Sequence, residues 1–218
     1  MSSRFTDSAV NEQKPLFIVL EGIDGSGKST QGKILKEYLE SKNIPCILTR
    51  EPGGTLLAEH LRKIILDPSI ELNDRSELLL FMASRAAHVN EIIKSALEHG
   101  KTVICDRFYL STFAYQGYGR GLNLNDIATV NDFASYGLKA DLTFIFDIDA
   151  ERSLVRTGKE ADRFEDAGNI FMEKVAEGYR ELAKQEKNCY LLDADLPIEE
   201  IAAHVQKILV NTVFEELK

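Results

Sequence analysis

The sequence has few cysteines and no excess of positive charge, and each shortage excludes a class of protein. Its three cysteines, Cys46, Cys105 and Cys189, are too few and too widely spaced for a disulfide framework or a zinc site. Each falls in a predicted strand, so we expect free thiols in a reducing compartment. A formal net charge of -9 argues against a general nucleic-acid partner, which requires a broad basic surface. A compact site for a small anion needs only a few local arginines and backbone amides, so the net charge does not exclude one.

Long apolar runs are also lacking. No uninterrupted apolar segment approaches the length that crosses a bilayer, so we expect no membrane partner. Residues 1–14 carry both signs of charge and no apolar signal-peptide core, which predicts a flexible tail and a cytoplasmic protein. No repeat, linker or low-complexity tract divides the remainder, so residues 15–218 are predicted to form one domain.

Five short apolar runs recur along the chain, at residues 16–20, 46–49, 102–105, 142–147 and 189–192. Nearly continuous hydrophobicity is typical of strands that are buried on both faces of a parallel sheet. Helical periodicity separates these runs, at residues 30–42, 55–66, 74–99, 125–138, 169–186 and 198–214. The alternation predicts an α/β fold: a five-stranded parallel sheet with helices on both faces and ligands at the carboxyl ends of the strands.

A phosphate-binding loop follows the first predicted strand. The pattern G-x-x-x-x-G-K-[ST] is matched by Gly22-Ile23-Asp24-Gly25-Ser26-Gly27-Lys28-Ser29, and Thr30 begins the next predicted helix. Glycines let successive backbone N–H groups point at an anion, and the helix N-terminus adds the positive end of its dipole. Lys28 is expected to reach the outer phosphates and the Ser29 hydroxyl to coordinate magnesium. The loop predicts a bound nucleoside triphosphate but does not specify the reaction that the triphosphate undergoes.

Asp106 and Arg107 follow the third predicted strand and bear on which reaction the triphosphate undergoes. A carboxylate that ends a strand near a phosphate loop commonly serves the magnesium shell, and a hydrolytic enzyme would add a residue that activates water. Arg107 cannot accept a proton, but it suits a second phosphate. The pair therefore favours transfer between two phosphorylated molecules over hydrolysis. An Asp106–Arg107 ion pair that only stabilises the strand end is the alternative.

Transfer onto a phosphate needs no strong base, because the attacking oxygen is already ionised. The protein must instead align two polyanions and neutralise their charge. The candidates for this role are five arginines from different segments, namely Arg50, Arg85, Arg107, Arg156 and Arg163. Residues 151–167 mix both signs of charge around a glycine, which predicts a mobile lid over the donor phosphates. A solvated loop without a role is the alternative for this segment.

Several of these segments together resemble the thymidylate kinases of the bacterial type, within the P-loop nucleoside monophosphate kinases. The resemblance is carried by residues 21–30, 50–55, 106–107, 111–116 and 162–165 with Phe81 and Arg85. It runs from about Leu16 to the C-terminus, and its Arg-Glu-Pro-Gly-Gly-Thr run is more specific than the phosphate loop. It implies a P-loop kinase fold and transfer of the γ-phosphoryl of ATP to dTMP. The products would be dTDP and ADP, in dTTP biosynthesis, by a homodimer that uses Mg²⁺ at Ser29 and Asp106.

The resemblance also implies roles for residues around the acceptor base. Phe81 would stack on the thymine ring and Arg85 would donate to a base carbonyl. Ser111 and Gln116 fall where the family places polar groups near the base, and Tyr115 would crowd the sugar 2′ position. By periodicity alone, core packing would be the better explanation of Phe81.

Other implied roles concern the phosphates. Arg50 and Arg107 would grip the acceptor phosphate, and Asp24 would meet the acceptor sugar 3′-hydroxyl or the magnesium shell. The family takes a catalytic arginine from the loop or from the lid, and residues 22–27 contain none. The lid must therefore supply it, from Arg156 or Arg163. We favour Arg156 over Lys159, because a planar bidentate donor suits a bridging phosphoryl oxygen. Lys28 and Arg107 complete the expected catalytic set.

Two alternative functions remain open from the sequence. The first is another small kinase, for a different nucleoside monophosphate or for a deoxynucleoside, in which Glu51 would deprotonate a hydroxyl. The second is a GTP-binding switch. Its guanine-recognition stretch Asn-Lys-x-Asp is absent, and Asp-x-x-Gly occurs only inside the phosphate loop.

Overall fold

The computed structural model describes residues 14–157 and 168–214, and its described part contains one five-stranded parallel sheet. The strands are β1 (Phe17–Glu21), β2 (Cys46–Arg50), β3 (Thr102–Asp106), β4 (Leu142–Asp147) and β5 (Cys189–Asp193). They lie in the order β2-β3-β1-β4-β5, so the first strand is central. The predicted fold class is confirmed, and each predicted strand end agrees with the structure to within one residue.

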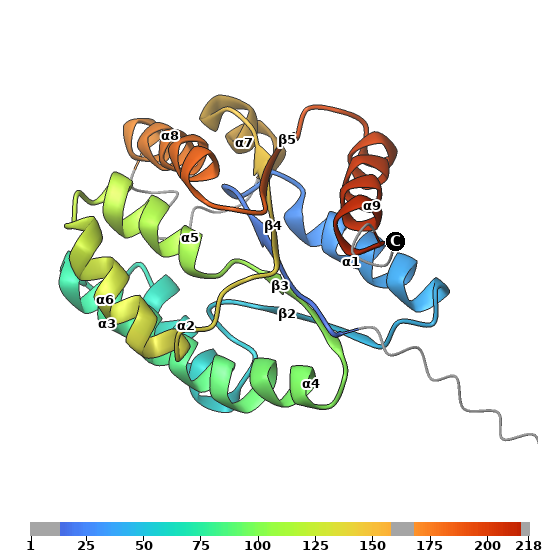
Figure 1. Ribbon diagram of the computed structural model, residues 1–218. Helices are drawn as coiled ribbons and strands as arrows, with labels where there is room; N and C mark the ends of the chain where they lie inside the picture. Colours follow the sequence, from blue (N-terminus) through green and yellow to red (C-terminus); the bar gives the residue numbers. More distant parts are fainter. Residues whose placement is uncertain (1–13, 158–167, 215–218) are drawn as a thin grey trace, which may run out of the picture.

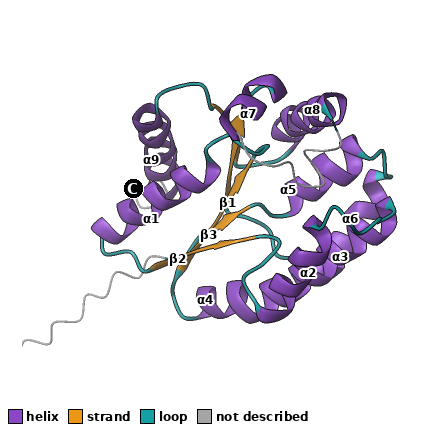
Figure 2. Ribbon diagram, turned by 180° about the vertical axis from the view of Figure 1, so that it is seen from behind, coloured by secondary structure: helices purple, strands orange, loops and turns teal. Residues whose placement is uncertain are grey.

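Helices cover both faces of the sheet. They are α1 (Lys28–Ser41), α2 (Leu56–Leu66), α3 (Asp74–His88), α4 (Lys94–Glu98), α5 (Tyr109–Thr112), α6 (Leu124–Ser135), α7 (Ala150–Thr157), α8 (Asn169–Gln185) and α9 (Ile198–Phe214). Two π-helical turns, η1 (Val89–Ile93) and η2 (Phe113–Gly119), connect α3 to α4 and extend α5. Helices α1 and α9 lie side by side on one face of the sheet, whereas α5 and α8 lie on the other (Figures 1 and 2). Helices α2 and α6 both pack against α3.

The structure differs from the predicted helices in two places. The single helix predicted over residues 74–99 is α3, η1 and α4 in one continuous run, with the π-helical turn in its middle. Helix α5 and the turn η2 were not predicted as helical, because residues 109–119 lack a regular apolar stripe. Single π-helical turns occur frequently at functional sites, and η2 carries the predicted base-site residues Tyr115 and Gln116.

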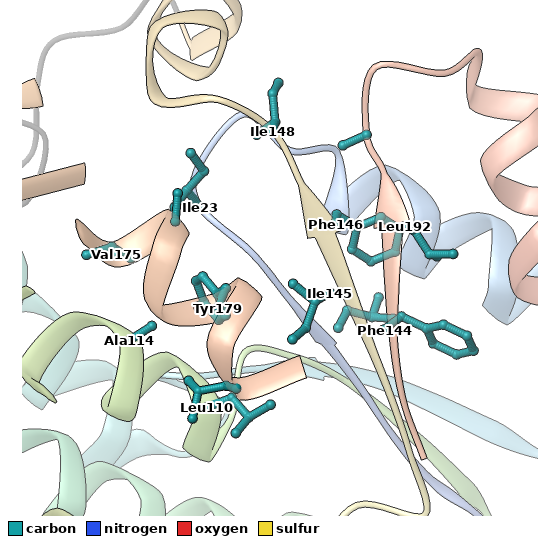
Figure 3. Close-up of a cluster of buried hydrophobic side chains, with 14 of the residues drawn as sticks. Ile23, Leu110, Ala114, Phe144, Ile145, Phe146, Ile148, Val175, Tyr179 and Leu192 are labelled. Atoms are coloured by element: carbon teal, nitrogen blue, oxygen red, sulfur yellow. The ribbon is translucent and has the colours of Figure 1, made fainter. Parts of the chain in front are cut away.

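The core between the sheet and α8 also anchors the phosphate loop. Tyr179 and Val175 of α8 lie in one cluster with Ile145 of β4 (Figure 3). Ile23, from the loop after β1, is buried in the same cluster. Burial of an aliphatic side chain contributes about 1.5–3 kcal/mol. The loop is therefore attached to the hydrophobic core through its own second residue.

Part of the predicted lid is helical. Residues 150–157 form α7, directly after β4, and the rest of the lid segment lies outside the described residues. The predicted tail lies outside them too, except for Lys14, so the tail and the lid stay predictions. Among the helices of the described ranges, none combines the length and apolar composition that a membrane span needs.

Helix α8 approaches η2 closely at Gly178. A Cβ atom at this position would lie 2.8 Å from the Cβ and Cγ atoms of Tyr118. Real Cβ contacts are longer, so an added methyl group would push α8 away from the element that carries Tyr115 and Gln116.

We predict that Gly178→Ala lowers the melting temperature, although alanine has the higher helix propensity. Overpacking costs about 1–3 kcal/mol, which exceeds the gain of about 1 kcal/mol from propensity over most of that range. Glu177→Ala, at the exposed neighbouring position, is the control and should be nearly neutral. Thermal unfolding of both variants measures the difference. A melting temperature that rises in Gly178→Ala would contradict the proposed close packing.

Candidate active site

The phosphate loop links β1 to α1 in a conformation that depends on glycine. Gly22 has φ 136°, and a Cβ there would lie 2.6 Å from the carbonyl oxygen of Phe146 in β4. Gly27 has φ 88° and directly precedes α1. Side chains larger than hydrogen are strained at both positions. The loop and the first turn of α1 line a cavity, here called the phosphate cavity, through Gly25, Gly27, Lys28, Ser29 and Thr30.

Lys28 is a buried cation at this cavity. Its Nζ donates to the carbonyl oxygen of Ile23 at 2.7 Å and to the Ser26 hydroxyl at 3.4 Å. Burial lowers the pKa of Lys28, and the nearby charge of Arg107 adds to this effect, so that the pKa is about 8. An anion bound at the loop would favour the protonated amine. Lys28 is therefore prepared for a ligand with negative charge.

Ser29 and Asp106 are the predicted metal ligands, and the fold brings them together. Asp106 pairs with Leu20 in the β1–β3 register, and its Oδ2 accepts a hydrogen bond of 2.6 Å from the Ser29 hydroxyl. Both residues line the phosphate cavity. In the described ranges, no group of three or more His, Cys, Asp or Glu side chains is arranged to hold a metal by itself. Mg²⁺ commonly takes one or two protein oxygens together with phosphates and water, so this pair fits magnesium.

Arg107 connects the end of β3 to the phosphate loop. Its Nη1 donates to the carbonyl oxygen of Gly22 at 2.8 Å, and its Nη2 donates to Asp24 Oδ1 at 2.9 Å. The guanidinium also contacts three hydroxyls at 3.2–3.3 Å, those of Ser111, Tyr115 and Tyr179. The backbone of Arg107 has φ 70°, a strained conformation for a residue with a Cβ. These contacts hold the side chain over the loop.

Asp24 is the acidic partner of Arg107. The sequence left open an ion pair between Arg107 and its neighbour Asp106, but the ion pair found is the one with Asp24, at 2.9 Å. The Arg107 charge lowers the pKa of Asp24 to about 2, against the opposing effect of burial and with a smaller contribution from Lys28. Asp24 is thus ionised at neutral pH and lies between two cations.

A second cavity, here called the base cavity, adjoins the first. All five residues predicted to surround the base line it: Phe81, Arg85, Ser111, Tyr115 and Gln116. Pro52, Leu66, Phe108 and Thr112 also line it. An apolar slot with a few fixed polar groups is the usual form of a site for a planar organic ligand. The sequence had assigned no role to Thr112.

Arg85 is a buried residue at the edge of the base cavity, and nearly all its donors are engaged. Nε donates to Glu51 Oε2 at 2.8 Å, and Nη2 donates to the carbonyl oxygen of Phe108 at 2.9 Å. Nη1 donates to Thr112 Oγ1 at 3.0 Å and to Asn131 Oδ1 at 2.7 Å. A guanidinium has five N–H bonds, so these contacts leave a single N–H, on Nη2, for a ligand.

Glu51 holds Arg85 in place. Its second oxygen lies 3.0 Å from His88 Nδ1, and His88 Nε2 lies 2.7 Å from the Thr49 hydroxyl. Burial raises the pKa of Glu51, but Arg85 and His88 outweigh this effect and hold the pKa below its usual value. A buried carboxylate with a low pKa and both oxygens engaged is a poor general base. This geometry therefore argues against Glu51 as the general base that a deoxynucleoside kinase would require.

Four residues line both cavities: Asp24, Glu51, Arg62 and Arg107. Sequence reasoning missed Arg62, which lies inside α2 and donates from Nη1 to the carbonyl oxygen of Pro52 at 2.9 Å. A lone arginine in a helix gives no local signal, and only the packing of α2 brings it to the junction. The boundary between the cavities thus carries two guanidinium groups.

Glu21 is a second residue without an assigned role. Its buried carboxylate accepts hydrogen bonds from the Ser111 hydroxyl at 2.5 Å, the Tyr179 hydroxyl at 3.1 Å and the Phe108 amide at 2.9 Å. Burial raises the pKa of Glu21 despite these bonds. An acidic residue at the end of an otherwise apolar strand was the signal for it in the sequence. Its bonds fix the start of α5, which carries Ser111.

The remaining predicted arginines differ in their positions. Arg50 is exposed, lines the phosphate cavity and donates from Nη2 to both oxygens of Glu59 at 3.2 Å. Arg156 of α7 also lines this cavity, and it donates to the carbonyl oxygen of Ala194 at 2.8 Å and to Asp195 at 3.1 Å. Arg163 lies outside the described residues.

Comparison with known proteins gives one consistent family. The family model described as thymidylate kinase matches residues 20–205. A thymidylate kinase of Pseudomonas fluorescens (strain SBW25) is 48% identical over 198 residues, which cover 89% of this chain and 92% of the relative. One from Thermosipho africanus is 44% identical over 195 residues, covering 89% and 97%. The crystal structure of thymidylate kinase from Ehrlichia chaffeensis aligns with a TM-score of 0.72 at 38% identity, covering 89% and 98%. With the paired cavities and the phosphate loop, these matches confirm the resemblance: the chain belongs to the thymidylate kinase family.

Proposed function

We propose that this protein is an ATP-dependent nucleoside monophosphate kinase that transfers the γ-phosphoryl of ATP to dTMP, giving dTDP and ADP in dTTP biosynthesis. One observation carries the proposal: a phosphate cavity and a base cavity meet at Asp24, Glu51, Arg62 and Arg107. Two guanidinium groups at that boundary suit a site where a phosphoryl group passes between two anions. Membership of the family supports dTMP as the acceptor.

On the acceptor side, we assign the base cavity to thymine. Phe81 would stack on the ring, and the remaining N–H of Arg85 would donate to a carbonyl oxygen of the base. Ser111 and Gln116 would supply polar contacts, and Tyr115 would lie against the sugar. A pocket that fixes its donors and acceptors in advance discriminates strongly against the wrong base.

The two cavities would share the phosphates of the substrates. Arg50, Arg62 and Arg107 would hold the acceptor phosphate, and Asp24 would meet the sugar 3′-hydroxyl or the metal. ATP phosphates would lie in the loop formed by Gly22, Ile23, Asp24, Gly25, Ser26, Gly27, Lys28, Ser29 and Thr30. Ile23 would act through its backbone, because its side chain is in the core.

Ser29 and Asp106 would hold Mg²⁺ at the phosphate cavity, as their 2.6 Å contact supports. The ion would neutralise negative charge on the phosphates. Lys28 and Arg107 would contribute fixed positive charge beside it. We also propose that residues 151–167 act as the lid of a single domain spanning 15–218, with Arg156 or Arg163 as the catalytic arginine.

We further propose a cytoplasmic homodimer. The three cysteines are free, which suits a reducing compartment. Large apolar side chains are exposed on three helices that pack together: Leu57 of α2 at 53%, Leu79 of α3 at 58% and Phe133 of α6 at 86%. Apolar side chains left exposed on adjoining helices support an interface between proteins on this part of the molecule. Sedimentation analysis of the full chain tests the dimer, and a monomer at micromolar concentration would contradict it.

ADP release measured with ATP, magnesium and a panel of nucleoside monophosphates tests the function. We expect dTMP to be the best acceptor and thymidine itself not to be phosphorylated. A preference for another monophosphate would overturn the assignment of dTMP. Phosphorylation of thymidine alone would favour a deoxynucleoside kinase, and tight GTP binding without any acceptor would favour a switch protein.

We predict that Arg156→Ala lowers kcat about a hundredfold or more while the affinity for dTMP changes little. A donor that bridges the phosphates acts mainly in the transition state, so its loss affects turnover more than binding. Arg152→Ala is a matched control, because Arg152 lies on the same helix and also pairs with Asp195. Steady-state kinetics and dTMP titration separate the two effects. Near-normal kcat in Arg156→Ala would remove this residue from the mechanism.

We predict that ATP binding at pH 8.5 is accompanied by proton uptake at Lys28. With a pKa of about 8, most of the free enzyme carries a neutral Lys28 at this pH, and the phosphates would raise the pKa again. In Lys28→Arg the side chain stays charged, so the uptake should be lost. Titration calorimetry in buffers of different ionisation enthalpy measures the protons. Equal uptake by both proteins would show that Lys28 does not take up the proton.

A further inference from the structure

A buried carboxylate contacts one residue of the base cavity. Glu77 of α3 is 1% exposed, and it accepts a hydrogen bond of 2.8 Å from Nε2 of Gln116. Its other oxygen accepts from Arg120 Nη2 at 3.2 Å. Gln116 lines the base cavity, whereas Glu77 is not among the described residues that line it. Of the hydrogen bonds described for Glu77, the one to Gln116 leads to a residue that lines the base cavity.

The contact decides which end of the Gln116 amide faces the cavity. A carboxylate offers only acceptors, so it binds the NH₂ group and never the oxygen. Among the described residues, no hydrogen bond to the Gln116 amide oxygen is found, and the buried side-chain atoms that lack a partner comprise only Ser84 Oγ. The Gln116 amide oxygen is therefore not fully buried, and the open space beside Gln116 is the base cavity.

We propose that Glu77 is a positioning residue that sets base selectivity, by holding the Gln116 amide with its oxygen toward the base. This inference rests on the proposed function, in which that base is thymine. The cavity then presents an acceptor from Gln116 and the one remaining N–H donor from Arg85. Thymine offers the complement, since its N3–H lies between two carbonyl groups.

Cytosine in the same orientation has an acceptor where thymine has a donor, and a donor where thymine has an acceptor. Its N3 has no hydrogen and would face the Gln116 oxygen, and its amino group replaces the carbonyl at C4. Buried polar groups left without a partner are costly, so such a base is rejected strongly. Uracil keeps the hydrogen-bonding edge of thymine and lacks only the methyl group. Glu77 should therefore affect discrimination against dCMP and leave discrimination against dUMP unchanged.

Glu77→Gln tests the proposal, because an amide at this position can also donate and lets Gln116 turn over. We expect kcat/KM for dTMP to fall about tenfold and the preference for dTMP over dCMP to fall by about tenfold or more. The preference for dTMP over dUMP should stay within about twofold of the wild-type value. Asp74→Asn is the matched control: Asp74 Oδ1 lies 3.8 Å from Arg120 Nε, on the first turn of the same helix, and that variant should keep all three values.

A double-mutant cycle with Gln116→Ala determines whether Glu77 acts through Gln116. If it does, Glu77→Gln causes no further loss of dCMP discrimination once Gln116 is truncated. Additive effects, or equal losses for dTMP, dUMP and dCMP, would overturn the proposal and leave Glu77 a purely structural residue. If thermal unfolding shows that Glu77→Gln does not fold, Glu77→Asp carries the same comparison, since it keeps the charge for Arg120 but shortens the reach to Gln116.

A wild-type enzyme that fails to phosphorylate dTMP would refute the proposed function, whereas unchanged selectivity in an active variant would refute this inference alone.

Discussion

The Arg107 guanidinium joins the end of β3 to the carbonyl oxygen of Gly22 and to the Asp24 carboxylate, and the site depends on this connection. Arg107 lines both cavities, so the same group that shapes the phosphate loop also closes the base cavity. A strained backbone at φ 70° persists only where the surroundings determine it. Here the surroundings are the loop, α5, η2 and α8, which all supply contacts to one side chain.

Buried carboxylates arrange the side chains around this centre. Glu51 orients Arg85, Glu77 orients Gln116 and Glu21 orients Ser111. Removing a charge from water is expensive unless every polar atom finds a partner, and a fully paired network in turn fixes its members rigidly. The protein thus uses buried charge to define the direction of these three polar side chains at the base cavity.

The sequence predicted the sheet well because strands buried on both faces are continuously apolar, and that pattern is local. It missed α5 and η2 for a related reason: residues 109–119 direct side chains both into the core and into the base cavity, which removes a regular stripe. The base-site residues were found through the family resemblance. Phe81 illustrates this, since helical periodicity alone favoured the core, and the side chain packs against core clusters while also lining the cavity.

By itself, the sequence determined the parallel sheet and the phosphate loop with Lys28 and Ser29, because these depend on short contiguous patterns. It also determined membership of the family, through several such segments spread over residues 20–205. Only the tertiary structure decided that Arg107 pairs with Asp24 and that Arg62 reaches the junction of the cavities. It also decided that Glu51 locks Arg85 and that Glu77 orients Gln116. Each of these contacts joins residues 34 to 83 positions apart, or, for Arg62, depends on how a whole helix packs. The geometry of these contacts follows from the packing of separate elements, and a short stretch of sequence does not reveal that packing.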